Sequence, residues 1–159
     1  MINIDDIKQR IARIAKTGNC QKRQVGCAIL SATSENVLVE ASNGMPTQSG
    51  LSCEGGDCPR CRTNLRFPHG AGYDLCFCLH AEERSISEAA RCGISLEGAI
   101  LYSTYQPCIM CLKLIIQVGI TGVRYIEQWA LPDTEWGLDG IKETYERLAS
   151  GFPKGFDPL

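Results

Sequence analysis

The sequence predicts one α/β domain in which helices pack on a mixed sheet. The chain has 159 residues, a length that suits a single hydrophobic core. Its second half alternates between strand-like and helix-like segments, which is typical of α/β proteins. Two strand-like segments in the first half are separated by a short polar turn and should form a hairpin, so the sheet should be mixed. We therefore expect a single domain over residues 1–159.

The first half predicts one helix followed by two strands. Isoleucine recurs at helical spacing near the N-terminus and predicts a helix over about residues 4–17. Apolar segments at 24–32 and 36–44 predict two strands, which the polar turn at 33–35 joins. Asn43-Gly44 is a common turn pair and should close the second strand. The residues that carry the helical pattern are Ile4, Ile7, Ile11 and Ile14.

The second half predicts three helices and two strands. Gly93 suits the C-terminal cap of the first of these helices, and Pro107 stands at a favoured first position of the second. The expected elements in chain order are a helix at about 80–92, a strand at 98–105, a helix at 107–119, a strand at 122–128, a helix at 138–150 and an irregular end at 151–159.

The segment at about 44–78 has no clear periodicity and is rich in Gly, Pro, Ser and Cys. A structureless loop of this length is uncommon inside a compact domain unless something holds it in place. A bound metal ion would be a physical reason for its order. Its candidate ligands are Cys53, Cys58, Cys61, His69, Cys76 and Cys78.

The cysteine content indicates metal binding in a reducing compartment. The chain has ten cysteines. We recognise no signal peptide and no apolar stretch of membrane-spanning length, so a cytoplasmic location without membrane contact is expected. Disulfides are rare there, and closely spaced cysteines in that setting favour metal ligation. Cys27 and Cys92 stand in apolar or helical contexts and are expected to be small core residues.

The charge of the chain argues against a nucleic-acid polymer as partner. The formal net charge is −2 at pH 7, so the chain has no overall positive field to attract a long nucleic acid. A small phosphorylated substrate needs only one or two local basic residues and remains compatible with this charge.

One set of residues is suited to a catalytic zinc site. His80 opens one expected helix, and Cys108 and Cys111 open another. Three protein ligands leave a fourth zinc position for water, whereas structural zinc sites usually have four protein ligands. Zinc lowers the pKa of that water to about 7, and Glu82 stands close enough in sequence to transfer its proton. A structural zinc site would give Glu82 no role.

His80-Ala81-Glu82 and Pro107-Cys108-Ile109-Met110-Cys111 match the H-x-E and P-C-x-x-C pattern of zinc-dependent nucleobase deaminases. Residues 20–126 resemble the deoxycytidylate (dCMP) deaminases more specifically. The matching stretches are CQKRQVGCAIL, SNGMP, LHAE, AARCGISLEGAILYST and QPCIMC. The resemblance implies the cytidine deaminase fold, a three-layer α/β/α sandwich with a mixed five-stranded sheet. It also implies hydrolysis of dCMP to dUMP and ammonia, which supplies thymidylate synthesis.

The same resemblance implies roles for residues around the zinc. A metal-bound hydroxide attacks the cytosine ring while Glu82 shuttles protons, and the Ala81 backbone contacts the base edge. Asn43 binds base or sugar, although a plain turn residue would explain it as well. Arg91 contacts a phosphate of substrate or effector, although a solvated cation at a helix end would explain it nearly as well.

The resemblance further implies regulation, assembly and a second metal. Family members form homo-oligomers, several of them hexamers, that dCTP with magnesium activates and dTTP inhibits. Some phage members hold a structural zinc, and the corresponding or nearby positions here are Cys20, Cys53, His69 and Cys78. His69 is one residue out of register with the family ligand, and Cys78 replaces a carboxylate. A rival ligand set draws on Cys58, Cys61 and Cys76, since Cys58-Pro59-Arg60-Cys61 has zinc-knuckle spacing.

Other functions fit parts of the pattern. A cytidine deaminase or a tRNA adenosine deaminase would use related zinc motifs, but the negative charge disfavours tRNA. A non-catalytic zinc-binding regulator is the alternative from another class, and the intact Glu82 disfavours it. The tail at 127–159 lies outside the resemblance. Its two tryptophans, Trp129 and Trp136, could form a lid or an oligomer contact, although ordinary packing explains them as well.

Overall fold

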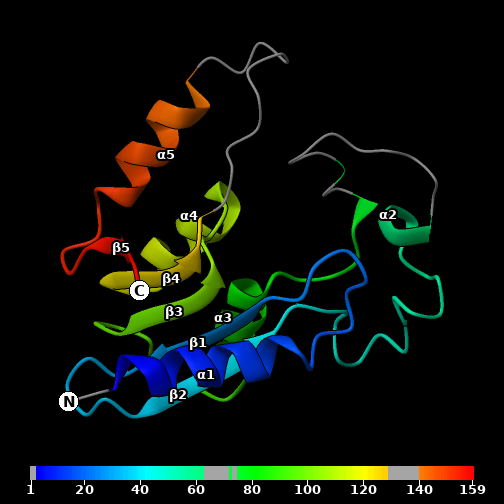
Figure 1. Cartoon of the computed structure of the whole chain (residues 1–159), viewed down its shortest axis with the longest axis horizontal. Coiled ribbons are helices and arrows are strands. Elements are labelled where there is room, and N and C mark those ends of the chain that lie inside the picture. Colours follow the sequence, from blue (N-terminus) through cyan, green and yellow to red (C-terminus); the bar gives the residue numbers. More distant parts are fainter. Residues whose placement is uncertain (1–2, 63–71, 73–74, 129–139) are drawn as a thin grey trace.

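The computed structural model describes residues 3–62, 72, 75–128 and 140–159 and contains one mixed five-stranded sheet (Figure 1). The sheet order is β2-β1-β3-β4-β5. β1 is antiparallel to both of its neighbours, whereas β3, β4 and β5 are parallel. The strands are β1 (Gly26–Leu30), β2 (Val37–Ser42), β3 (Ile100–Tyr105), β4 (Gly122–Glu127) and β5 (Phe156–Pro158).

Helices cover both faces of this sheet. Alternate residues of β1 point to opposite sides: Ala28 and Leu30 pack against α1, whereas Cys27 and Ile29 belong to the larger core on the other side. α3, α4 and α5 contribute to that larger core. The predicted three-layer sandwich is therefore confirmed. The helices are α1 (Ile4–Ala15), α2 (Pro59–Arg62), α3 (Ala81–Arg91), α4 (Ile109–Gln117) and α5 (Ile141–Ala149).

Two predictions about secondary structure were wrong. The end of the chain is not wholly irregular, because Phe156–Pro158 pairs in parallel with β4. This strand is too short for an alternation of apolar and polar residues to predict it from the sequence. The ring of Phe156 packs against Tyr125 and Tyr145 and so holds the strand in place. Pro107 is also not the first residue of α4, since Cys108 is the N-cap. Assignments of helix ends commonly differ by a residue or two.

The described part of the cysteine-rich segment up to α2 lies beside the sheet and not on either of its faces (Figure 1). Its one described helix is the short α2, which the sequence did not predict. Within the described residues, no helix is long and apolar enough to cross a membrane.

α1 lies unusually close to the start of β1. A Cβ atom added to Gly26 would lie 2.1 Å from the Ile11 carbonyl oxygen and 2.7 Å from the Ala15 backbone nitrogen. The Gly26 backbone N–H donates a 3.0 Å hydrogen bond to Thr104 Oγ1, which also fixes the strand from the other side. Only glycine fits between this helix and the sheet.

Gly26→Ala should therefore destabilise the protein by roughly 1–3 kcal/mol, because the added methyl group meets backbone atoms that cannot move independently. Urea unfolding measures the change. Ala12→Ser, which adds one atom on the exposed face of the same helix, should change stability by less than about 0.5 kcal/mol. Wild-type stability of Gly26→Ala would show that α1 does not approach the strand as described.

Candidate metal centre

Two helix N-termini bring the predicted metal ligands together. His80 is the N-cap of α3, and Cys108 is the N-cap of α4. The His80 Nδ1 atom lies 3.5 Å from Cys108 Sγ and 3.4 Å from Cys111 Sγ. Cys108 and Cys111 stand 28 and 31 positions after His80 in the chain, and the three side chains converge on one point. The backbone N–H of His80 donates a 2.7 Å hydrogen bond to the Glu83 carboxylate, which fixes the start of α3.

The geometry of these three donors fits zinc. Zn–N bonds are about 2.0 Å and Zn–S bonds about 2.3 Å, so nitrogen and sulfur in a tetrahedral site lie about 3.5 Å apart. The ligand atoms of His80, Cys108 and Cys111 all lie within 4.8 Å of one another. Two thiols and one imidazole leave one tetrahedral position for a small molecule.

The protonation of the two thiols differs. The Cys111 thiol donates a hydrogen bond that lowers the pKa of Cys108 to about 4, and His80 adds to the effect against the opposing influence of burial. The same thiol–thiol contact, with burial, raises the pKa of Cys111 well above its usual value. Burial opposes a charged His80, but the contact with Cys108 raises its pKa to about 9. Zinc binding would displace the remaining protons from these ligands.

Glu82 lies in the first turn of α3 and is 4% exposed. The Sγ atom of Cys111 lies 3.8 Å from the Glu82 carboxylate oxygen Oε2. Burial raises the pKa of Glu82 to about 7, although the charge on His80 opposes this change. A carboxyl group with such a pKa can both accept and donate a proton near neutral pH. Ala81, between His80 and Glu82, is fully buried.

Asn43 follows β2 and is 6% exposed. Its Oδ1 atom accepts a 2.7 Å hydrogen bond from the Val25 backbone N–H, and its Nδ2 atom donates a 2.7 Å bond to the Arg23 carbonyl oxygen. The side chain thus ties the end of β2 to the segment before β1. The predicted contact of Asn43 with a substrate stays a prediction.

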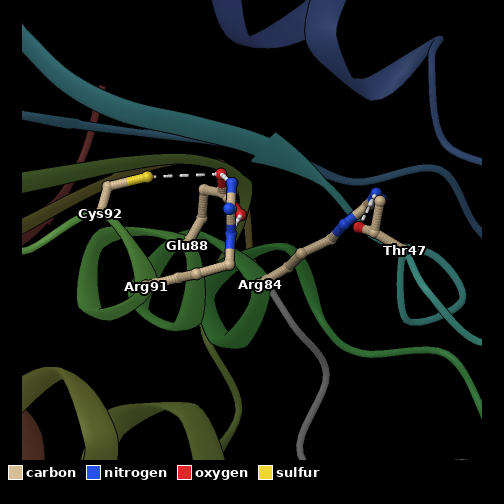
Figure 2. A network of polar contacts seen from close by, with 5 residues as sticks. All are labelled: Thr47, Arg84, Glu88, Arg91 and Cys92. Atoms are coloured by element: carbon tan, nitrogen blue, oxygen red, sulfur yellow. Dashed lines mark hydrogen bonds and ion pairs between the residues drawn. The ribbon is translucent and has the colours of Figure 1, made fainter.

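Arg91 lies in the last turn of α3, about 15 Å along the helix from Ala81 at 1.5 Å per residue. Its Nε atom donates a 3.1 Å hydrogen bond to Glu88. Figure 2 shows Arg84 extending to Thr47 while Arg91 turns to Glu88. Arg84 also donates a 3.2 Å bond to the Ser42 carbonyl oxygen and so braces the end of β2. The phosphate contact of Arg91 stays a prediction.

Two supporting residues were not predicted from the sequence. Arg84 stands four positions after His80, on the same helical face, and this spacing is the signal that could have identified it. The Tyr145 hydroxyl of α5 donates a 2.6 Å hydrogen bond to the Pro107 carbonyl oxygen and so supports the start of α4. A buried tyrosine commonly finds such a partner, but its sequence position does not reveal which one.

Two cysteines outside this centre, Cys27 and Cys92, were predicted to be core residues. Cys27 is fully buried in the larger core, as predicted. Cys92 is exposed, so the prediction of a core position for it was wrong. It follows the last turn of α3, where its thiol donates to Glu88 at 3.6 Å (Figure 2). All ten cysteines lie within the described residues, and all are free thiols.

The sulfurs of Cys20, Cys53 and Cys78 form one group within 4.8 Å of one another. His69, the fourth residue of that predicted set, lies outside the described residues, as do Trp129 and Trp136. The members of the rival set do not stand apart, because Cys58 and Cys61 group with Cys53, and Cys58 and Cys76 group with Cys78. The two predicted ligand sets therefore belong to one cluster.

Residues 2–127 match the model of the cytidine and deoxycytidylate deaminase zinc-binding region. The chain belongs to this family. The chain is 40% identical over 111 residues to the deoxycytidylate deaminase of Schizosaccharomyces pombe, and this alignment covers 70% of this chain and 33% of that protein. It is 33% identical over 130 residues to the deoxycytidylate deaminase of Saccharomyces cerevisiae, and this alignment covers 81% of this chain and 39% of that protein. This chain thus spans 33% and 39% of the lengths of these two relatives.

The fold of this family member also matches a solved structure. The dCMP deaminase of the cyanophage S-TIM5, in complex with dCMP and dUMP, superposes with a TM-score of 0.68. The alignment covers all of both chains at 20% identity. At this identity the likeness shows a shared fold.

Asn43→Ala should destabilise the protein by about 1–3 kcal/mol, because it leaves the Val25 N–H and the Arg23 carbonyl without their side-chain partner. Thermal unfolding checks this effect. Gln9→Ala, an exposed polar truncation on α1, is the matched control and should leave the midpoint nearly unchanged. Equal midpoints for both variants would contradict a structural role of Asn43.

Proposed function

We propose that this chain is a zinc-dependent deaminase that hydrolyses dCMP to dUMP and ammonia. The observation that carries the proposal is the convergence of His80, Cys108 and Cys111 beside the buried carboxyl group of Glu82. The two yeast relatives that align with most of this chain are named deoxycytidylate deaminases, which favours dCMP over other nucleobase substrates.

In the proposed mechanism, His80, Cys108 and Cys111 hold the metal. Zinc bound there supplies a nucleophile at neutral pH, because it lowers the pKa of a coordinated water to about 7. Glu82 takes a proton from the attacking water and passes it to N3 of the cytosine ring, and then takes the second proton of that water and passes it to the leaving amine. Burial supports this role, since it keeps the pKa of Glu82 near 7.

Substrate binding draws on the same edge of the sheet. We assign the Ala81 backbone to the edge of the base and Asn43 to base or sugar. The two hydrogen bonds that Asn43 makes hold its amide in one orientation, which suits it to present its remaining donor and acceptor capacity. Arg91, which lies about 15 Å from Ala81 at the other end of α3, is assigned to a phosphate group of substrate or effector.

The proposal includes regulation, assembly and cellular role. The chain would form a homo-oligomer, a hexamer by family resemblance, that dCTP with magnesium activates and dTTP inhibits. Its product dUMP would supply thymidylate synthesis in the cytoplasm. At least one structural zinc would also be bound by a group of cysteines that includes Cys20, Cys53 and Cys78, whose sulfurs lie close enough to share one ion.

The direct test of the proposed function is dCMP turnover by wild type and by Glu82→Gln. Loss of the proton shuttle should lower kcat by at least about 10²-fold, while zinc content measured by mass spectrometry stays equal to wild type. Glu143→Gln, an exposed change on α5, is the control for loss of one carboxylate. Wild-type turnover by Glu82→Gln would refute the proton-shuttle role of Glu82. Turnover of cytidine or adenosine in place of dCMP would refute the assignment of dCMP as the substrate.

Arg91→Ala should raise KM for dCMP roughly ten-fold or more and leave deoxycytidine turnover unchanged, because a hydrogen bond to a charged group contributes about 1.5–3 kcal/mol. Steady-state kinetics on both substrates give the comparison. Arg13→Ala removes an exposed arginine of α1 and should change neither. An unchanged KM for dCMP, with loss of the dCTP response alone, would transfer the contact from substrate to effector.

A further inference from the structure

Six cysteine side chains meet at one place outside the centre described above. They come from the segment after α1, from the loop before α2 and from α2 itself, and from the segment just before α3. Four of the six are buried and two are half-buried. The six residues are Cys20, Cys53, Cys58, Cys61, Cys76 and Cys78.

The sulfur atoms form three overlapping groups of three, with all atoms of a group within 4.8 Å of one another. Each pair of groups shares one sulfur, and the shared atoms belong to Cys53, Cys58 and Cys78. The Sγ atoms of Cys53 and Cys61 lie 3.2 Å apart, and those of Cys58 and Cys76 lie 4.0 Å apart. Sulfurs at the corners of a tetrahedral zinc site lie about 3.8 Å apart, so these spacings suit thiolate ligation.

One zinc ion cannot account for the cluster. A tetrahedral zinc takes four ligands, so a single ion would leave two of these closely packed thiols unused. Two tetrahedral ions need eight ligand positions, and six sulfurs supply eight when two of them bind both ions. Zn₂Cys₆ modules use this stoichiometry. We propose that the six loop cysteines hold two zinc ions that share two thiolates, drawn from the three sulfurs common to the overlapping groups.

The surroundings of the cluster support bridging thiolates. The backbone N–H groups of Phe77, Cys61 and Arg60 lie near the Cys58 thiol. The Gln21 backbone N–H lies 3.5 Å from Cys53 Sγ and points to it. Six thiolates and two zinc ions carry two excess negative charges, and such N–H donors stabilise that excess in a buried site.

The cluster also gives the loop its structural reason. Cys20 follows α1, and Cys78 stands two residues before His80. Among the described residues, Met45 is the one apolar residue besides cysteines that packs in the cluster. Metal–thiolate bonds therefore take the part that a hydrophobic core plays elsewhere, and metal binding becomes part of the folding free energy of this segment.

Zinc content per chain is the first test, and it does not depend on deaminase activity. Wild type should contain about three zinc ions, and Cys108→Ser/Cys111→Ser, which lacks the thiolates of the candidate catalytic centre, should retain about two. Cys92→Ser, a change at an exposed cysteine outside both sites, should keep all three. Two ions in wild type and one in the double variant would overturn the proposal, as would iron in place of zinc.

Cadmium NMR of the wild-type protein, reconstituted with the NMR-active isotope, is the second test and needs no variant. Two all-sulfur resonances should appear and should show scalar coupling to each other through the shared sulfurs, in addition to the signal of the mixed nitrogen and sulfur centre. One all-sulfur resonance, or two without mutual coupling, would overturn the shared-thiolate arrangement. A failure of dCMP turnover would leave both of these readouts unaffected.

Discussion

The approach of the α3 and α4 N-termini is the constraint on which the site depends. β2 and β3 run in the same direction, because each is antiparallel to β1, and their carboxyl ends therefore lie at one edge of the sheet. β2 leads directly to Asn43, and β3 leads through Pro107 to Cys108. Open α/β sheets bind ligands at this edge. Helix N-termini there also favour thiolates, because they carry partial positive charge.

The same arrangement buries acidic groups close together, and their negative charge would be unfavourable there without a cation. Glu82 is buried beside two thiols and an imidazole, and burial of an unpaired charge is strongly unfavourable. A divalent ion neutralises the thiolates and gives the buried donors a partner. The second cluster likewise buries cysteine side chains, with Met45 as the one other apolar residue that packs there in the described part of the chain. A metal ion bound at His80, Cys108 and Cys111, and the two zinc ions proposed for the other cysteines, would therefore each couple the stability of the fold to metal binding.

The sequence predicted what depends on local spacing. His80, Glu82, Cys108 and Cys111 form short motifs at helix starts, so both their identity and their placement on elements could be inferred. Exposure of Cys92 could not, because helical position alone does not say which face meets the core. β5 was missed because its pairing with β4 is tertiary and its three residues are too few for periodicity. The merging of two predicted ligand sets likewise depends on how distant segments meet.

Anomalous diffraction at the zinc edge from crystals of this protein tests the central claim most directly. The account predicts a zinc peak about 2.0 Å from the His80 nitrogen and about 2.3 Å from the sulfurs of Cys108 and Cys111, with the Glu82 carboxylate near the metal but not bonded to it. Direct coordination of zinc by Glu82 would close the site and contradict a proton-transfer role. A peak in the loop alone, with none between α3 and α4, would contradict the catalytic centre itself.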